Sequence, residues 1–213
     1  MVYRVDHIAR PGETIASSAH EVFAGGKGAN QSAALALAGA EVFHAGQIGP
    51  EGQWLVDKLV GFGVNMMYTL TGETPTGHAI IQVDNQGQNS IVLFPGANKK
   101  ISHSAIDSTL SHFAQGDTLL LQNEINGIDY LIAQGKERGF KVCFNPAPYG
   151  PEVLAYPLHF VDLLIVNETE ARGLLGPAVA DQLIDRLAAA WPQAQIVLTL
   201  GEQGAHYSSA QER

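Results

Sequence analysis

The sequence predicts an α/β protein, in which a three-layer α/β/α sandwich with a mainly parallel central sheet carries a small β-sheet lid. Two observations lead to this prediction. Short apolar segments alternate with segments of helical periodicity, which is the pattern of parallel strands that helices cover on both faces. Two other regions alternate apolar and polar residues as strands do, but lack the helices that crossovers between parallel strands require.

The elements of the sandwich follow from this periodicity in chain order. Residues 28–40 are rich in Ala and Leu, which favours a helix that ends near Gly39. A strand is expected at 41–48, and a second helix at 50–62 that Gly61 and Gly63 terminate. Strands are then expected at 117–122, 142–144, 163–166, 196–200 and 205–208, and helices at 127–138, from 168 onward and at 179–190.

The lid is predicted from two stretches, at about residues 13–24 and 76–95. The alternating patterns within them cover residues 14–23 and 77–94. The second contains a hairpin, with strands at 79–83 and 90–94 joined by a turn at 84–87. A small sheet of this kind has open edges and an apolar face that need a covering surface. We therefore expect the lid to cover a ligand and to mediate a homodimer.

Composition limits the classes of partner. The 213 residues are expected to form one domain, residues 1–213. Their formal net charge of −9 argues against nucleic acid or an anionic membrane surface as the main partner. Cys143 is the only cysteine in the sequence, which excludes a disulfide framework and a thiolate metal cluster. With no apolar signal segment and no stretch long enough to cross a membrane, a cytoplasmic location is expected.

The most informative motif is the segment GGKGAN at residues 25–30. Its glycines let a ligand approach the backbone closely, and the helix that follows presents free N–H groups. Lys27 adds a cation, and Asn30 offers both a donor and an acceptor. The spacing fits neither a Walker loop nor a dinucleotide fingerprint. The segment is therefore either a site for an anion or a hydroxyl-rich ligand, or a tight turn without a ligand.

Further motifs follow predicted strands. NETE at 167–170 either meets a ligand at the sheet edge or simply caps the next helix, with Asn167 as N-cap and Glu170 three residues later. TLGEQG at 199–204 is either a phosphate-binding turn or a plain one. Glu124 also follows a strand, where its carboxylate could accept hydrogen bonds from sugar hydroxyls, and NPAP at 145–148 reads as a stiff loop. All of them are expected at one edge of the sheet.

Together with PGET at 11–14, these motifs stand in the order and approximate spacing of the ribokinase-like carbohydrate kinases, the phosphofructokinase-B type, and the sequence resembles that family over essentially its whole length. The resemblance implies a central sheet with a β lid, and ATP-dependent phosphorylation of a sugar hydroxyl, with ribose as the expected sugar. It places the sugar at Gly26, Lys27, Gly28, Asn30 and Glu124. It places ATP at Asn167, Thr199, Gly201, Glu202 and Gly204, and Mg²⁺ at Glu170 through water.

The sequence also departs from the family pattern. The family's sugar-binding Asp would lie just before Met1 by spacing, so Asp6 is not that residue. No Gly-Ala-Gly-Asp segment, which holds the family's general base, occurs in the sequence. We therefore expect a chain that is incomplete at both ends and contains no catalytic residue of its own. The resemblance implies that most of the adenine pocket and a loop for a monovalent cation (K⁺) belong to the intact enzyme and are missing here.

Two alternatives to a ribose kinase stay open. The first is a non-catalytic fragment that binds a sugar or a nucleotide. The second is a kinase of the same family that acts on fructose, a sugar acid or a nucleoside, because hydroxyl-binding groups are common to all these substrates.

Overall fold

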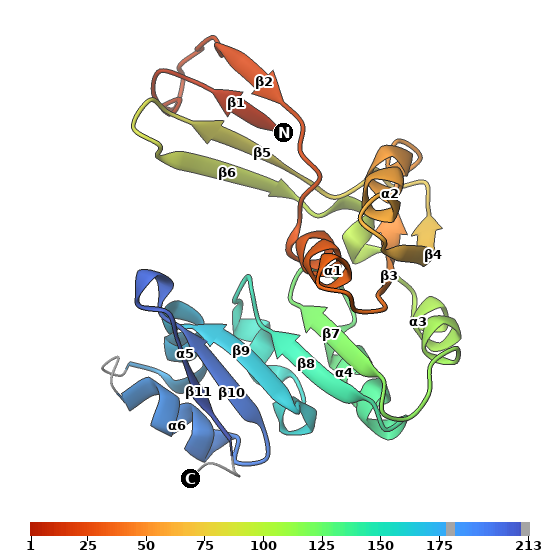
Figure 1. Cartoon of the computed structure of the whole chain (residues 1–213). Coiled ribbons are helices and arrows are strands. Elements are labelled where there is room, and N and C mark those ends of the chain that lie inside the picture. Colours follow the sequence, from red (N-terminus) through yellow and green to blue (C-terminus); the bar gives the residue numbers. More distant parts are fainter. Residues whose placement is uncertain (178–181, 210–213) are drawn as a thin grey trace. The chain divides into compact units, whose positions relative to one another are not determined.

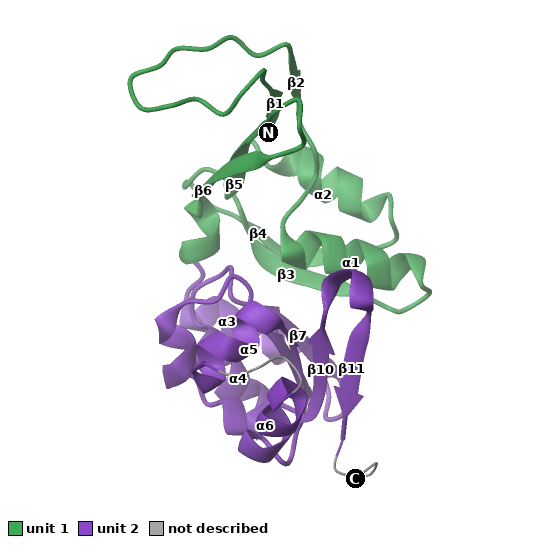
Figure 2. Cartoon of the chain, turned by 90° about the vertical axis from the view of Figure 1, so that its left-hand side faces the viewer, with its two compact units in different colours: residues 1–100 green, residues 101–213 purple. Residues whose placement is uncertain are grey.

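The computed structural model describes residues 1–177 and 182–209. The chain divides into two compact units, Met1–Lys100 and Ile101–Arg213, which Figure 2 colours separately. Two positions from the predicted pattern, the helix start at Val179 and the chain end at Arg213, lie outside the described residues. Among the described residues, no helix is both long and apolar enough for a bilayer crossing.

The second unit is built on a five-stranded sheet with the strand order β11-β10-β9-β8-β7 (Figure 1). The four strands β7 to β10 are parallel, and β11 runs antiparallel to β10 at the edge. The predicted alternation of strands and helices is confirmed for this unit. The strands are β7 (Thr118–Gln122), β8 (Lys141–Asn145), β9 (Leu163–Asn167), β10 (Gln195–Thr199) and β11 (Ala205–Ser208).

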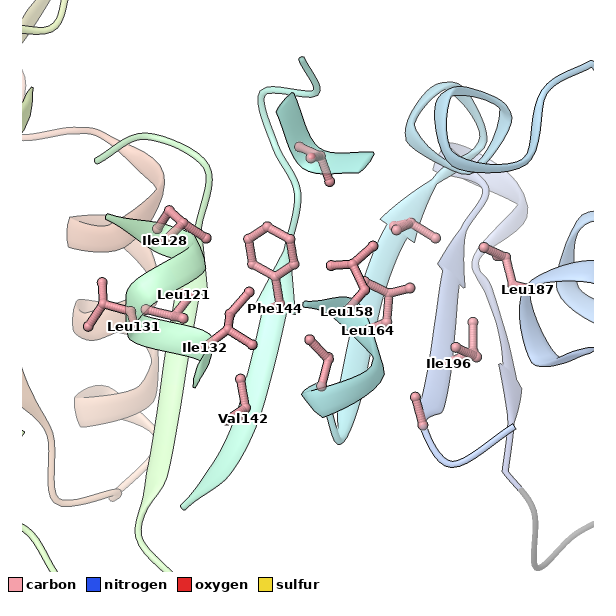
Figure 3. Packing of buried hydrophobic residues seen from close by; sticks show 14 of the residues in the cluster. Leu121, Ile128, Leu131, Ile132, Val142, Phe144, Leu158, Leu164, Leu187 and Ile196 are labelled. Carbon is pink, nitrogen blue, oxygen red and sulfur yellow. The ribbon is translucent and has the colours of Figure 1, made fainter. Parts of the chain in front are cut away.

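The helices of the second unit pack on this sheet and enclose its main core. Helix α4 packs on β7 and β8, α5 on β9 and β10, and α6 on β10 and β11. Phe144, Leu164 and Ile196 on the strands meet Ile132 and Leu187 on the helices, and all are almost fully buried (Figure 3). The helices are α3 (His103–Leu110), α4 (Ile128–Glu137), α5 (Glu168–Leu175) and α6 (Leu183–Ala190), with 3₁₀ turns η2 (Pro151–Ala155), η3 (Leu158–Phe160) and η5 (Gly201–Gln203).

The first unit contains a four-stranded sheet, which we call the lid sheet. Its strands are β1 (Val2–Arg4), β2 (Ala19–Glu21), β5 (His78–Val83) and β6 (Asn89–Phe94), in the order β2-β1-β5-β6. The predicted hairpin is confirmed, since β5 and β6 pair antiparallel with Ile81 opposite Ile91. The predicted strand at 14–23 is mostly wrong. Only its end is a strand, because a turn at Pro11–Gly12 and an irregular segment precede Ser18.

The rest of the first unit is a two-stranded parallel sheet with two helices. Strands β3 (Phe43–Ile48) and β4 (Asn65–Thr71) pair with each other, and helices α1 (Lys27–Leu37) and α2 (Gln53–Val60) accompany them. A small core forms around Ala29, Leu59 and Val64. The 3₁₀ turn η1 (Gly96–Lys99) is the last element of the unit. Both predicted helices and the predicted strand are confirmed, each a few residues shorter than expected.

Candidate functional site

The parallel strands of the second unit run in the same direction, so the loops after them lie at one edge of the sheet. Gln122 at the end of β7 lies opposite Asn145 at the end of β8. Thr199 at the end of β10 lies opposite Asn167 at the end of β9. Ligands of open α/β sheets bind at this carboxyl edge. The structure thus brings the second unit's candidate residues, between 124 and 204, to the expected edge.

Asn167 and Glu170 form the capping box that the sequence spacing indicates at the start of α5. The Asn167 side chain accepts a hydrogen bond from the N–H of Glu170 at 2.9 Å, and the Glu170 carboxylate accepts from the N–H of Asn167 at 3.0 Å. Asn167 Nδ2 also donates to Glu170 Oε1 at 2.9 Å. Glu170 is 6% exposed, so these bonds fix a buried carboxylate at the sheet edge.

Asn145 belongs to the same cluster, although the sequence only indicated a stiff loop there. Its Nδ2 donates to the carbonyl of Ile165 at 2.7 Å and lies 3.4 Å from Glu170 Oε2. This contact depends on the pairing of β8 with β9, which no local pattern reveals. The one available signal is a polar residue at the end of an apolar strand, on the edge where ligands bind.

The Glu170 carboxylate fits a magnesium ion held through water. Three hydrogen bonds already occupy it, two at Oε2 and one at Oε1. A carboxylate has about four lone-pair positions, so room remains to accept a hydrogen bond from a metal-bound water. No three His, Cys, Asp or Glu side chains gather into a metal cage within residues 1–177 and 182–209. Mg²⁺ usually keeps several waters and needs no such cage.

The turn after β10 has the glycine conformations that a phosphate-binding turn uses. Gly201 and Gly204 have φ of 59° and 88°, which favour glycine. The N–H of Leu200 donates to the carbonyl of Gly204, and the N–H of Gly204 donates to the carbonyl of Gly201. The Gly204 N–H is therefore used within the turn, and the whole turn, residues 201–204, is exposed.

Glu124 follows a buried amide that the sequence analysis missed. Asn123 is 5% exposed, and its Nδ2 donates to the carbonyl of Pro148 at 2.8 Å and to Glu152 Oε1 at 2.9 Å. Its Oδ1 accepts from the hydroxyl of Tyr156 at 3.0 Å. With both ends of its amide bonded, Asn123 fixes the backbone that carries the half-buried Glu124.

The remaining candidates, residues 26–30, lie in the first unit at the start of α1. Gly26 is the N-cap with φ 97° and ψ 144°, a conformation that side chains rarely adopt, and its carbonyl accepts the N–H of Asn30 at 3.0 Å. No side chain caps this helix. Lys27 and Gly28 are half-buried and Asn30 is exposed. The start of α1 therefore presents first-turn N–H groups, such as those of Gly28 and Ala29, that no carbonyl within the helix accepts.

Comparisons with known proteins agree with this geometry. The sequence profile described as pfkB family carbohydrate kinase matches residues 1–213. The ribokinase of Haemophilus influenzae is 36% identical over 187 residues, which are 85% of this chain and 60% of that protein. The chain therefore spans less than two thirds of that relative's length.

Two solved ribokinases share the fold. The ribokinase of Cryptococcus neoformans in complex with ADP is 32% identical with a TM-score of 0.79, over 98% of this chain and 72% of that one. The ribokinase of Arabidopsis thaliana, complexed with ribose and ATP, is 27% identical with a TM-score of 0.82, over 100% of this chain and 72% of that one. The chain has the α/β sheet and the lid sheet, and the family profile matches it over residues 1–213. The chain therefore belongs to the pfkB family of carbohydrate kinases.

Proposed function

We propose that the protein transfers a phosphoryl group from ATP to a hydroxyl of ribose. The single observation that carries this proposal is the cluster at the carboxyl edge of the sheet, where Asn145 and Asn167 contact the buried Glu170 and Thr199 pairs with Asn167. Phosphoryl transfer depends on positioning and on neutralising phosphate charge, which amides, glycine turns and a metal-linked carboxylate can provide. The ribokinases similar to this chain support ribose as the sugar.

In this proposal the sugar is bound by Gly26, Lys27, Gly28, Asn30 and Glu124. The glycines allow the sugar to approach the start of α1, where first-turn N–H groups donate to its oxygen atoms. Lys27 and Asn30 add side-chain donors, and Glu124 accepts hydrogen bonds from sugar hydroxyls. The structure describes Glu124 in the second unit and the other four residues in the first.

The nucleotide is bound by Asn167, Thr199, Gly201, Glu202 and Gly204. Asn167 is the N-cap of α5, a helix start that favours phosphate, and the turn at 201–204 follows β10 on the same edge. Mg²⁺, when bound through Glu170, would neutralise phosphate charge. Glu170 itself orients Asn167, since its two oxygens accept both the N–H and the Nδ2–H of that residue.

A second candidate function is binding without catalysis. None of the residues assigned above is a general base for the sugar hydroxyl, and the sequence contains no Gly-Ala-Gly-Asp segment. A positioned general base contributes about 10²–10⁴-fold to rate. If the protein is a kinase, we therefore expect the 213 residues to bind ribose and ATP but to catalyse phosphoryl transfer far more slowly than a longer member of the family.

A coupled assay of ADP release with ribose, fructose and adenosine tests both candidates. The kinase proposal expects ADP release that increases on addition of ribose, at a rate about 10²–10⁴-fold below that of a longer family member. If ADP release does not change on addition of ribose, fructose or adenosine, but ribose binding is saturable, the binding function would be favoured. A rate within tenfold of the longer protein would mean that an unassigned residue supplies the base.

We also propose that the protein forms a homodimer through the lid sheet. Ile91 is 52% exposed and lies opposite Ile81, and Leu93, on the same face of β6, is 63% exposed. Apolar residues on an open sheet favour a covering surface. Sedimentation at micromolar concentration should show a dimer that the double substitution Ile81→Lys and Ile91→Lys dissociates. A monomer before substitution, or a dimer after it, would contradict the proposal.

A further inference from the structure

The carboxylate of Glu51 holds the base of the lid sheet. Glu51 lies between β3 and α2, and its Oε1 accepts the N–H of Thr76 at 2.6 Å. Thr76 in turn accepts the N–H of Gly49 at its hydroxyl at 2.9 Å. Two hydrogen bonds thus join the loop at 49–52 to the residue that stands two positions before the start of β5.

The same point is packed without room for added atoms. A Cβ at Gly49 would lie 2.6 Å from Glu51 Oε2 and 2.7 Å from the Cα of Pro75. Gly96 has φ +50°, and a Cβ there would lie 2.3 Å from the carbonyl oxygen of Pro75. Ala97, which is fully buried, donates its N–H to that same carbonyl at 2.9 Å. The segment that enters β5 and the segment that leaves β6 are therefore locked to each other beside Glu51.

The path of the chain shows why this junction matters for the position of the lid sheet. The lid sheet joins the rest of the first unit through residues 22–26, which lead from β2 to α1, through residues 72–77, which lead into β5, and through Pro95, which follows β6. The last two connections meet at the junction of Glu51, Thr76 and Pro75. The first runs directly into the proposed sugar-binding segment. Whatever fixes the base of β5 and β6 therefore fixes the lid sheet relative to the start of α1.

We infer that Glu51 is a positioning residue that holds the lid sheet, through Thr76, in the orientation that covers the sugar. This inference rests on the proposed function, because the sugar at the start of α1 is part of it. Glu51 makes no contact with the sugar in this account. Its side chain is exposed, so its substitution should leave the core of the first unit intact.

Amide hydrogen exchange and ribose titration, applied to the same variants, test the inference. Glu51→Ala removes the acceptor, and Glu51→Gln keeps a carbonyl oxygen that can still accept from Thr76. Asp57→Ala is the matched control, since Asp57 is an exposed carboxylate on α2 whose described partner is Gln53 on the same helix. A second variant, Thr76→Val, keeps the Thr76 N–H but removes the hydroxyl that holds Gly49.

We expect Glu51→Ala to increase exchange at Thr76 about tenfold and to weaken ribose binding about three- to tenfold, with ADP binding unchanged. Glu51→Gln should have a smaller effect on both, Thr76→Val should also weaken ribose binding, and Asp57→Ala should change neither.

An unchanged rate of amide exchange at Thr76 in Glu51→Ala would show that Glu51 does not hold Thr76, and would overturn the inference. Faster exchange with unchanged ribose affinity would overturn the positioning role. Failure of the unsubstituted protein to bind ribose would instead overturn the proposed sugar site, and the positioning role with it, whatever the exchange result.

Discussion

Asn167 and Glu170 cap each other at the start of α5, each accepting a hydrogen bond from the other's backbone N–H. Asn167→Ala removes one of these acceptors and the Nδ2 donor to a buried carboxylate, so it should lower the free energy of unfolding by about 1 kcal/mol or more. Urea denaturation measures this loss. Asn167→Ser keeps a capping oxygen and should lose less, while exposed Thr169→Ala should be nearly neutral. Equal losses for Ser and Ala would contradict the capping role.

Gly173 is needed because the ring of Tyr149 lies against it. The Tyr149 hydroxyl donates to the carbonyl of Gly173 at 2.6 Å, and a Cβ at residue 173 would lie 2.5 Å from the ring. Gly173→Ala should therefore destabilise the protein by about 1–3 kcal/mol, although alanine is the better helix former. In a Tyr149→Ala background the same change should become neutral or stabilising. Thermal unfolding of the four proteins decides this, and an unchanged cost in that background would refute the steric explanation.

Gly26 and Gly25 form a matched pair for the segment before α1. Gly26 has φ 97°, where a side chain is strained, whereas Gly25 has open space around its Cβ position and no positive φ. Gly26→Ala should cost about 1–3 kcal/mol of stability, and Gly25→Ala less than about 0.5 kcal/mol. Chemical denaturation measures both. Similar costs would mean that the conformation of Gly26 is not what the segment requires.

His44 should make stability depend on pH. His44 is on β3, and its Nδ1 is 2.8 Å from the hydroxyl of Ser32 on α1. Burial lowers the pKa of His44 below the usual 6.5. In the unfolded chain the imidazole binds a proton below about pH 6.5, but in the folded protein only at a lower pH. Stability should therefore be full above pH 6.5 and fall as the pH drops from there toward the folded-state pKa.

Denaturation midpoints between pH 7.5 and 5 test this prediction. His44→Gln, which cannot be protonated in this range, should flatten the part of the profile that lies below pH 6.5. A profile that His44→Gln leaves unchanged would show that another group causes the pH dependence.

The second unit was predictable from sequence because its strands are continuous apolar segments. Leu164, Val166, Ile196 and Leu198 are buried on a sheet that helices cover, which gives their strands a signal independent of long-range contacts. The elements that escaped prediction lack such a signal. Strand β1 has three residues, β4 mixes exposed and half-buried residues, and α3 has only two buried residues in eight.

The site was predictable to the extent that it is local. The spacing of Asn167 and Glu170 indicates a capping box, and the glycines at 201 and 204 indicate a turn. The contacts of Asn123 with Glu152 and of Asn145 with Glu170 join residues 25 or more positions apart. They exist only once the strands have paired, so no periodicity or spacing in the sequence could reveal them.

The central claim is that Asn30 and Glu124 each take part in binding the sugar, while Asn167 serves the nucleotide. Calorimetric titration of ribose and of ADP into the unsubstituted protein, Asn30→Ala, Glu124→Ala and Asn167→Ala tests it most directly. The account predicts that ribose binding weakens about three- to tenfold in Asn30→Ala and roughly tenfold or more in Glu124→Ala, with ADP binding unchanged in both. Asn167→Ala should weaken ADP binding alone. Equal losses for ribose and ADP in the first two variants, or no ribose binding by the unsubstituted protein, would contradict the claim.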